Sequence, residues 1–248
     1  MTKCIKCDNK EYESGFCKLH FQNYMENKVR KTIRKFKLIN KAKHKVGIAV
    51  SGGKDSSTLL FILKKLGYKI EAITVNANIG NYSKQNLKNL EEFCEKLNIK
   101  LHTISFREEY GFALCYIRDV LKQKGYDYQS CVICGVLRRK IINKYSKKLG
   151  FDLLATGHNM DDEAQSILMN IFRNDTKRIY RGGPISGITR DKKFVTRIKP
   201  LYQISESEIT KYSKLKKFPV KYERCPCSTE AFRMEFRNIL EPYTKKHP

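Results

Sequence analysis

The stretch 49-AVSGGKDSSTLL-60 decides the fold. A short apolar run, 46-VGIAV-50, enters a Ser-Gly-Gly turn, and an apolar, helix-like segment leaves it. A turn that joins a strand to a helix directs backbone N–H groups and the helix N-terminus at one place, which suits an anion. The stretch therefore predicts a phosphate-binding loop. However, the G-x-x-x-x-G-K-[ST] spacing is absent, and Asp55 stands where that motif has Ser or Thr.

The side chains of this loop fit the same interpretation. The two glycines let the backbone approach phosphate oxygens, the serines offer hydroxyl groups, and the lysine adds a positive charge. The aspartate at the helix start suits either capping of the helix or a share in holding Mg²⁺. The candidate nucleotide-binding residues are Ser51, Gly52, Gly53, Lys54, Asp55 and Ser56.

Apolar runs of strand length alternate with helical patterns on both sides of the loop. This alternation predicts an α/β fold in which a parallel sheet has helices on both faces. Residues 174–204 are expected to form a loop and a strand, and the tail returns to helix at 205–215 and 228–240. The predicted strands are 46–51, 69–75, 100–105 and 152–156, and the predicted helices between and after them are 55–66, 84–97, 135–149 and 161–173.

Composition limits the function. Lys and Arg outnumber Asp and Glu by 50 to 25, a net charge of +25, which favours a nucleic-acid partner. The start, MTKCIKCDNK, lacks the apolar stretch of a secretory signal, and no run reaches the length of a membrane span. A cytoplasmic protein is therefore expected, and its nine cysteines point to metal binding or catalysis rather than disulfides. Cys94 and Cys115 have no cysteine neighbours and are expected in the core.

The first cysteine set, at the N-terminus, has the ligand count of a structural zinc site. Two knuckle-like pairs supply four ligands within seventeen residues, and zinc would stabilise so short a segment. These ligands are Cys4, Cys7, Cys17 and His20. The chain is thus expected to consist of a zinc finger (1–20), a basic helix and linker (21–45) and a catalytic domain (46–248).

A second cysteine pair, Cys131 and Cys134, is ambiguous. A single C-x-x-C is compatible with half a zinc site, a redox pair or two ligands of an iron–sulfur cluster. Cys225 or Cys227 in the tail would complete three ligands, and all four together would suit a second zinc site.

A third feature, 156-TGHNMDDEAQSILMN-170, follows a predicted strand, where open α/β sheets bind ligands. Asp161 and Asp162 suit helix capping, Mg²⁺ coordination or proton transfer, and capping alone would need only one of them.

Together these segments resemble the PP-loop ATP pyrophosphatases, of which S-G-G-K-D-S is the signature. Within that group the chain resembles the tRNA 2-thiouridine synthetases of archaea and some bacteria, over nearly its whole length. The segments that carry the resemblance are the N-terminal zinc ligands, 20-HFQNYMENKVRKTIRKFKLI-39, 51-SGGKDSS-57, 131-CVICGVLRRK-140, 157-GHNMDDEAQSILMN-170, 199-KPLYQISESEI-209 and Cys225-Pro226.

The resemblance implies an activity and a set of site residues. The loop and Gly157 would bind ATP, which is cut between its α- and β-phosphates to adenylate the C2 oxygen of a tRNA uridine. Cys131, Cys134 and Cys225 would hold a [4Fe-4S] cluster whose open iron binds sulfur. Arg138, Asp55, Asp161 and Asp162 would take part in catalysis. The sulfur donor would be sulfide or a ubiquitin-like carrier protein, and the resemblance also allows a homodimer.

The chain departs from the family pattern in three places. It stops at Pro248 without a second, C-terminal zinc finger, the acid usual after the second strand is replaced by 76-NANIGN-81, and Cys227 is an extra cysteine. Three alternatives are weaker. A 2-thiocytidine or lysidine synthetase would lack the N-terminal zinc ligands, a small-molecule amidating enzyme would not need the +25 charge, and a non-enzymatic RNA-binding protein would not need the loop or the acidic pair.

Overall fold

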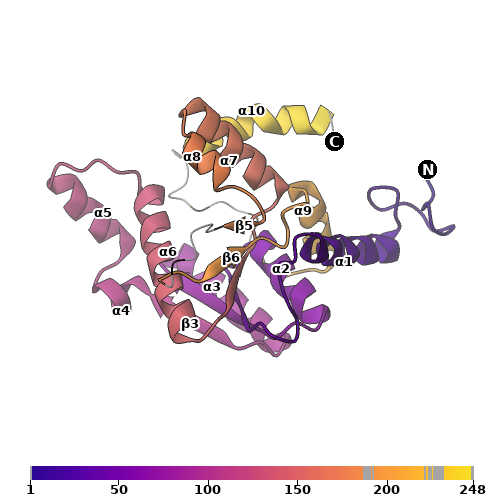
Figure 1. The fold of residues 1–248 in the computed structure, drawn as a ribbon, viewed down its shortest axis with the longest axis horizontal. Coiled ribbons are helices and arrows are strands. Elements are labelled where there is room, and N and C mark those ends of the chain that lie inside the picture. Colours follow the sequence, from indigo (N-terminus) through magenta and orange to yellow (C-terminus); the bar gives the residue numbers. More distant parts are fainter. Residues whose placement is uncertain are drawn as a thin grey trace.

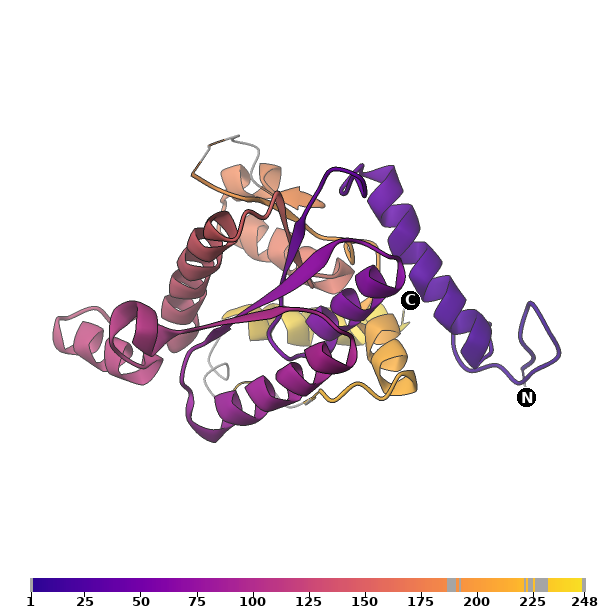
Figure 2. The same ribbon diagram turned by 90° about the horizontal axis from the view of Figure 1, so that it is seen from below.

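A mostly parallel sheet carries the fold, as Figures 1 and 2 show for the computed structural model. The structure describes residues 2–186, 191, 193–220, 222, 225 and 232–246. Within these residues the strands are β1 (Val46–Ala49), β2 (Ile70–Asn76), β3 (Leu101–Ser105), β4 (Leu153–Thr156), β5 (Ile185–Ser186) and β6 (Thr196–Ile198). The helices of the same residues are α1 (Lys18–Lys35), α2 (Lys54–Lys65), α3 (Gly80–Lys96), α4 (Phe106–Tyr110), α5 (Leu114–Gln123), α6 (Ser130–Lys148), α7 (Met160–Phe172), α8 (Thr176–Tyr180), α9 (Glu206–Leu215) and α10 (Phe232–Lys246).

The strand order, β3-β2-β1-β4-β6-β5, places the functional loops. All neighbouring strands are parallel except β5, which pairs antiparallel with β6. The chain runs from β1 outward through β2 to β3, and then returns to the other side of β1 with β4. The order therefore reverses between β1 and β4, and in open α/β sheets ligands bind beyond the carboxyl ends of the strands at such a point. The predicted α/β fold is confirmed.

Both faces of the sheet are covered by helices, which explains why its strands are continuously apolar. Side chains of one strand alternate between the faces. Ala72 of β2 joins the core formed with α1, α2, α3 and α9, whereas its neighbour Ile73 joins the core formed with α5 and α6. In β4, Leu153 likewise joins the first of these cores and Leu154 the second.

The N-terminal segment is attached to the main core by α1 (Figure 2). Phe21, Met25, Val29 and Ile33, on one face of the helix, are buried in the core that contains α2 and α9. Their spacing of four residues is that of one helix face. Because α1 begins at Lys18, one helix spans the expected border between residues 20 and 21.

The structure differs from the sequence prediction in several elements. Helix α6 begins at Ser130 instead of residue 135, and α10 ends at Lys246 instead of residue 240. The first residues predicted for α10, 228–231, lie outside the described part of the chain, as do Pro226 and Cys227. Helices α4, α5 and α8 were not predicted, and Cys115 of α5 is exposed, so its expected core position is wrong. Cys94 is buried as predicted.

Candidate active site and metal centres

The predicted phosphate loop is shaped by glycine conformation and by serine hydroxyl groups. Gly52 has a positive φ of 78°, which favours glycine, and Gly53 precedes α2 without any side-chain cap. The first N–H groups of α2 therefore remain available to an anion. The Ser51 and Ser56 hydroxyl oxygens lie 3.3 Å apart, and Ser56 Oγ donates to the Gly53 carbonyl at 3.1 Å, which holds the turn closed.

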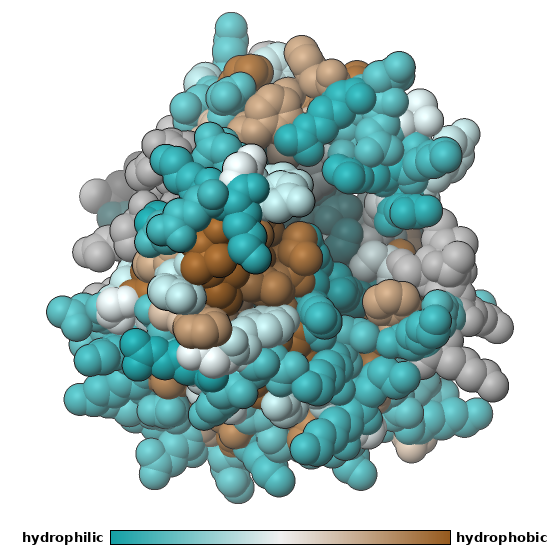
Figure 3. All heavy atoms as spheres, turned by 90° about the vertical axis from the view of Figure 1, so that its left-hand side faces the viewer, coloured by the Kyte–Doolittle hydropathy of each residue, from teal (hydrophilic) through white to brown (hydrophobic). Residues whose placement is uncertain are grey.

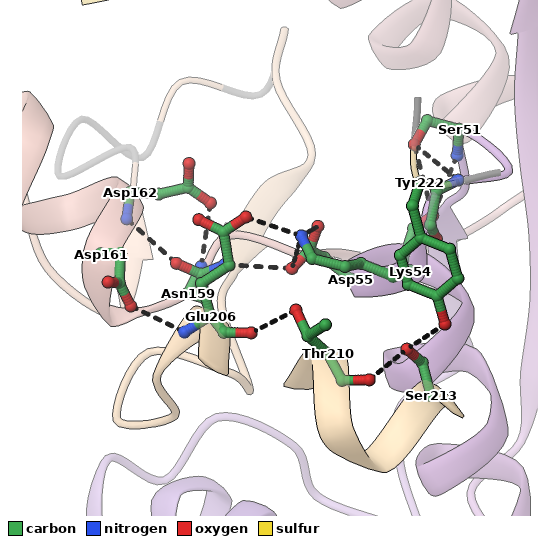
Figure 4. Close-up of polar contacts among 12 residues, drawn as sticks. Ser51, Lys54, Asp55, Asn159, Asp161, Asp162, Glu206, Thr210, Ser213 and Tyr222 are labelled. Atoms are coloured by element: carbon green, nitrogen blue, oxygen red, sulfur yellow. Dashed lines mark hydrogen bonds and ion pairs between the residues drawn. The ribbon is translucent and has the colours of Figure 1, made fainter. Parts of the chain in front are cut away.

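Lys54 lies between two carboxylates, as Figure 4 shows. Its Nζ is 3.0 Å from Asp55 Oδ2 and 2.9 Å from Glu206 Oε1, and Glu206 also accepts from Arg237 at 2.7 Å. Burial lowers the pKa of Lys54 by itself, but the two carboxylates outweigh it and raise the pKa. Glu206, at the start of α9, was not predicted as a site residue.

The negative charge of Asp55 is less well compensated than that of Glu206. Burial raises the pKa of Asp55, and the charges of Asp162 and Glu206 raise it further, against the lowering effect of Lys54. Asn159 Nδ2 donates to Asp55 Oδ1 at 3.1 Å. A bound cation would stabilise this partly buried carboxylate, which makes Asp55 a candidate Mg²⁺ ligand.

The two acids of the predicted pair lie in different surroundings. Asp162 completes a capping box with Asn159 at the start of α7, and its Oδ1 is 3.0 Å from Arg233. Asp161 Oδ2 accepts the backbone N–H of Glu206 at 2.7 Å and so supports the start of α9. Among the described residues, Asp162 lines a cavity with Asp55, whereas Asp161 lines a separate groove between α7, α9 and α10.

Gly157 follows β4 and touches the phosphate loop directly. A Cβ atom at this position would lie 2.9 Å from the backbone nitrogen of Ser56. The loops after β1 and β4 are therefore in van der Waals contact, as the reversal of strand order predicts. His158, whose ring nitrogen is 2.8 Å from Thr156 Oγ1, is exposed beside the second of the two cavities described next.

Two cavities meet at the phosphate loop. The first, of about 350 Å³, is lined by Ser51, Gly52 and Gly53 together with the end of β2, α3 and the beginning of α6. The second, of about 650 Å³, is lined by residues of α6, α7, α8 and β6. Ser51, Gly135 and Arg138 belong to both, so these three residues form the wall between them.

The second cysteine set lines the first cavity. Cys131, Cys134 and Cys225 lie on its wall beside the phosphate loop, and Arg138 Nε donates to Cys134 Sγ at 3.1 Å. Burial raises the pKa of Cys131, and the neighbouring Cys225 and Cys134 raise it further. Three thiols within electrostatic reach of one another and next to a guanidinium fit a thiolate-ligated metal group. The structure thus brings Cys225 to the C-x-x-C pair across more than ninety residues of sequence.

The four N-terminal ligand atoms converge on one point. Sγ of each cysteine is 3.4 Å from His20 Nδ1, and the Cys7 and Cys17 sulfurs are 3.7 Å apart. Tetrahedral zinc with bonds of about 2.0 to 2.3 Å requires ligand separations of about 3.5 to 3.8 Å. Burial by itself raises the pKa of Cys4, but backbone N–H groups of Cys17 and Lys6 lower it to about 6, so a thiolate is favoured. These residues fit zinc.

Comparison with known proteins agrees with this geometry. Residues 22–242 match the model of the PP-loop domain. The chain is 34% identical to a tRNA-5-methyluridine(54) 2-sulfurtransferase of Pyrococcus horikoshii, a match that covers 99% of this chain and 78% of the relative. The chain belongs to the PP-loop tRNA 2-sulfurtransferase family.

Two further relatives support this assignment. The tRNA 2-thiolation protein NcsA of Haloferax volcanii is 32% identical over 94% of this chain and 76% of its own length. The U34-tRNA thiolase NcsA from Methanococcus maripaludis, solved with its [4Fe-4S] cluster, superposes with a TM-score of 0.84 at 33% identity, covering 100% of this chain and 84% of that one. An NMN synthetase from Francisella tularensis, at 13% identity and a TM-score of 0.53, shares the fold alone over 92% of this chain and 87% of its own.

No helix in the described part of the PP-loop chain has both the length and the apolarity to cross a membrane.

Proposed function

We propose that this chain thiolates a tRNA uridine at C2. ATP would first adenylate the C2 oxygen, and sulfur would then replace the adenylated oxygen. The observation that carries the proposal is the first cavity, in which the phosphate loop and Cys131, Cys134 and Cys225 line one space. The relatives named as tRNA 2-sulfurtransferases and 2-thiolation proteins support the choice of tRNA and of C2.

The phosphate loop would perform the adenylation step. The uncapped N-terminus of α2 and the hydroxyl groups of Ser51 and Ser56 would bind the β- and γ-phosphates as they leave together as pyrophosphate. Asp55 and Asp162, on the wall of the second cavity, would hold Mg²⁺, which neutralises phosphate charge when bound. Phosphate oxygens would compete with Glu206 for Lys54, whose Nζ is within 3.0 Å of both Asp55 and Glu206.

The cysteine wall would perform the sulfur step. Cys131, Cys134 and Cys225 would hold a [4Fe-4S] cluster, which when bound would offer an open iron to the sulfur that the donor delivers. Arg138 lies in the wall shared by the two cavities, so its guanidinium can stabilise negative charge that develops between the adenylated oxygen and the sulfur. Gly157 would keep the loop after β4 close enough to the phosphate loop for both steps to use one uridine.

The remaining partners follow from the same proposal. Zinc bound by Cys4, Cys7, Cys17 and His20 would fix the first turn of α1. The sulfur donor would be free sulfide or a ubiquitin-like carrier protein, which thiolation assays with each donor distinguish. We propose a cytoplasmic protein, as the name of a relative from Drosophila virilis, cytoplasmic tRNA 2-thiolation protein 1, suggests. A homodimer is proposed too, and its test is light scattering.

An anaerobic thiolation assay tests the proposal. Wild-type protein reconstituted with iron and sulfide should release pyrophosphate from ATP in the presence of tRNA and form 2-thiouridine. Asp55→Ala should lose both activities. Cys225→Ala should lose iron and thiolation but keep pyrophosphate release, because the phosphate loop remains intact. Cys115→Ala, which changes an exposed cysteine on α5, serves as the control and should keep both. Formation of 2-thiouridine by iron-free protein, or its absence with the complete system, would contradict the proposal.

A further inference from the structure

The second cavity has more cations than its acids can compensate. Its acidic side chains already have basic partners: Asp55 pairs with Lys54 and Asp162 with Arg233, each at 3.0 Å. Glu163 pairs with Lys199 at 2.6 Å, and both of these side chains are only 12% exposed. No carboxylate of the described cavity lining is thus left for further basic residues.

Arg139 and Arg197 are among the basic residues of the cavity lining that have no carboxylate partner. Arg197 lies on β6 in register with Leu154 of β4, and Arg139 lies on α6, against Gly135. Neither side chain has an ion pair or a hydrogen bond to any residue that the structure describes. Burial lowers the pKa of Arg197, and the positive charge of Arg139 lowers it further.

The half-buried Arg197 lies within electrostatic reach of the exposed Arg139 with no acid to compensate their charges, which is unfavourable in an isolated protein. An anion between them would remove this cost, and the planar guanidinium fork suits the two oxygens of a phosphate group. Neither arginine lines the first cavity, where the glycines of the phosphate loop lie. The anion would therefore bind away from these glycines, in the cavity that Asp55 and Ser56 of α2 also line.

We propose that Arg139 and Arg197 bind a backbone phosphate of the RNA substrate next to the nucleotide that enters the second cavity. The inference rests on the proposed function and adds a binding subsite to it. A cavity of about 650 Å³ is of the size that small-molecule ligands occupy, and so has room for a nucleotide. The exposed Lys177 and Arg181 of α8 and its C-cap continue the positive charge from the cavity to the surface.

The molecular surface on the α5 and α6 side agrees with an RNA path. Hydrophilic side chains surround an apolar patch on this face (Figure 3). The exposed Tyr126 and Tyr128, in the loop before α6, have parallel rings with centroids 6.1 Å apart. Exposed aromatic rings offer stacking surfaces to unpaired bases.

Binding measurements on the intact, anaerobically reconstituted protein test this inference. The probe is fluorescently labelled, unmodified bulk tRNA, and anisotropy is recorded at several salt concentrations. Arg197→Met and Arg139→Met should each weaken tRNA binding about tenfold or more, since each removes a charge-assisted contact. Each should also reduce the slope of log affinity against log salt by about one. Arg197→Lys should restore part of the affinity because it keeps the charge.

Three controls show whether the loss of affinity belongs to this subsite. Lys69→Met, which removes an exposed charge just before the amino end of β2, should leave tRNA affinity within about twofold of wild type. ATP affinity measured without tRNA should be unchanged in Arg197→Met. Its melting temperature should be equal to or higher than that of wild type, because a like-charge contact is relieved.

Two outcomes would overturn the inference. In one, Arg197→Met lowers the melting temperature and leaves tRNA binding intact, which would make the arginine structural. In the other, it weakens ATP binding in the absence of RNA, which would assign the pair to ATP. Failure of the proposed function gives a different result: wild-type protein would form no 2-thiouridine, while the effect of Arg197→Met on tRNA binding would persist.

Discussion

Replacing Gly157 with alanine should separate the two loops that form the nucleotide site. Gly157 packs directly against the start of α2, and its φ lies outside the left-handed region, so the expected effect is steric. The added Cβ would meet Ser56 N at 2.9 Å and Asp55 C at 3.0 Å. These are backbone atoms, which cannot rotate away as a flexible side chain can.

The size of the effect follows from these distances. Ordinary contact begins at 3.4 Å, so the gap between residue 157 and Ser56 must widen by about 0.5 Å. Inserting a methyl group into packed structure costs about 1 to 3 kcal/mol. The lower chain entropy of unfolded alanine offsets about 0.4 to 1 kcal/mol of this. A net loss of about 1 to 2 kcal/mol corresponds to a melting temperature about 2 to 8 °C lower for a chain of this size.

Thermal unfolding and ATP binding by calorimetry measure the two consequences. Gly157→Ala should lower the melting temperature by the stated amount and weaken ATP binding at least about tenfold, because the loop amides are displaced. Gly53→Ala is the matched control. Its Cβ would meet only Ser51 Oγ, at 3.5 Å, so the melting temperature should be unchanged while the methyl group hinders phosphate approach. A Gly157→Ala protein with wild-type stability and ATP affinity would refute the reasoning.

Three further variants test other parts of the molecule. Cys4→Ser should reduce zinc by about one atom per chain while leaving iron unchanged, as metal analysis can measure; loss of iron instead would reverse the assignment of the two sites. Glu208→Gln should be less stable by about 1 to 3 kcal/mol at pH 7. Burial raises the pKa of Glu208, but the hydrogen bonds from Lys28, Ser205 and Tyr24 together with the charge of Lys28 outweigh it and lower the pKa. This stabilisation is therefore present above the ordinary carboxyl pKa of about 4.3 and is lost as the pH falls through the folded-state value. Between pH 7 and pH 3, the free energy of unfolding measured with urea should therefore decline less for Glu208→Gln than for wild type. An equal decline in the two proteins would contradict this. Reversing the charge of the exposed Lys31 and Arg34 on α1 should reduce the slope of log tRNA affinity against log salt concentration by about two. Unchanged binding would mean that this helix face is exposed to solvent and does not contact tRNA.

Much of the fold could be predicted because its signals are local. The strands are short apolar runs beside glycine turns, and buried parallel sheets require such runs. The start of α6 at Ser130 was missed because no local signal marks it: Gln129 provides no side-chain cap, and the first turn has no acid. The prediction for α10 ends before Pro242, which lies inside the helix.

Helix α5 carried a signal that the sequence prediction missed. Leu114, Ile117 and Leu121 recur at helical spacing, and all three pack into the core beside α6. Helix α4 has only five residues and depends on the capping box of Ser105 with Glu108, so periodicity could not reveal it.

Much of the candidate site was predictable because it consists of contiguous motifs, whereas the distant Cys225 was predicted as a partner of Cys131 and Cys134 from its residue type and the family resemblance. The phosphate loop and the zinc ligands are such motifs, and the structure brings their members together. The contact between Lys54 and Glu206 spans 152 positions of sequence, and no local pattern marks Glu206 as its partner. The balance of charge in the second cavity likewise depends on which residues of several elements, distant in sequence, meet there.

The attachment of α1 to α9 has a consequence for synthesis on the ribosome. Helix α1 ends at Lys35, but α9, against which its apolar face packs, begins only at Glu206. At about 5 to 20 residues per second, the ribosome needs about 10 to 30 s to reach that point. During this interval Phe21 and Met25 have no complete core to enter, whereas the candidate zinc ligands all lie within the first twenty residues. Metal binding can therefore set the first turn of the helix well before the rest of its partners exist, and a cell short of zinc would expose this helix to aggregation and proteolysis at the nascent stage.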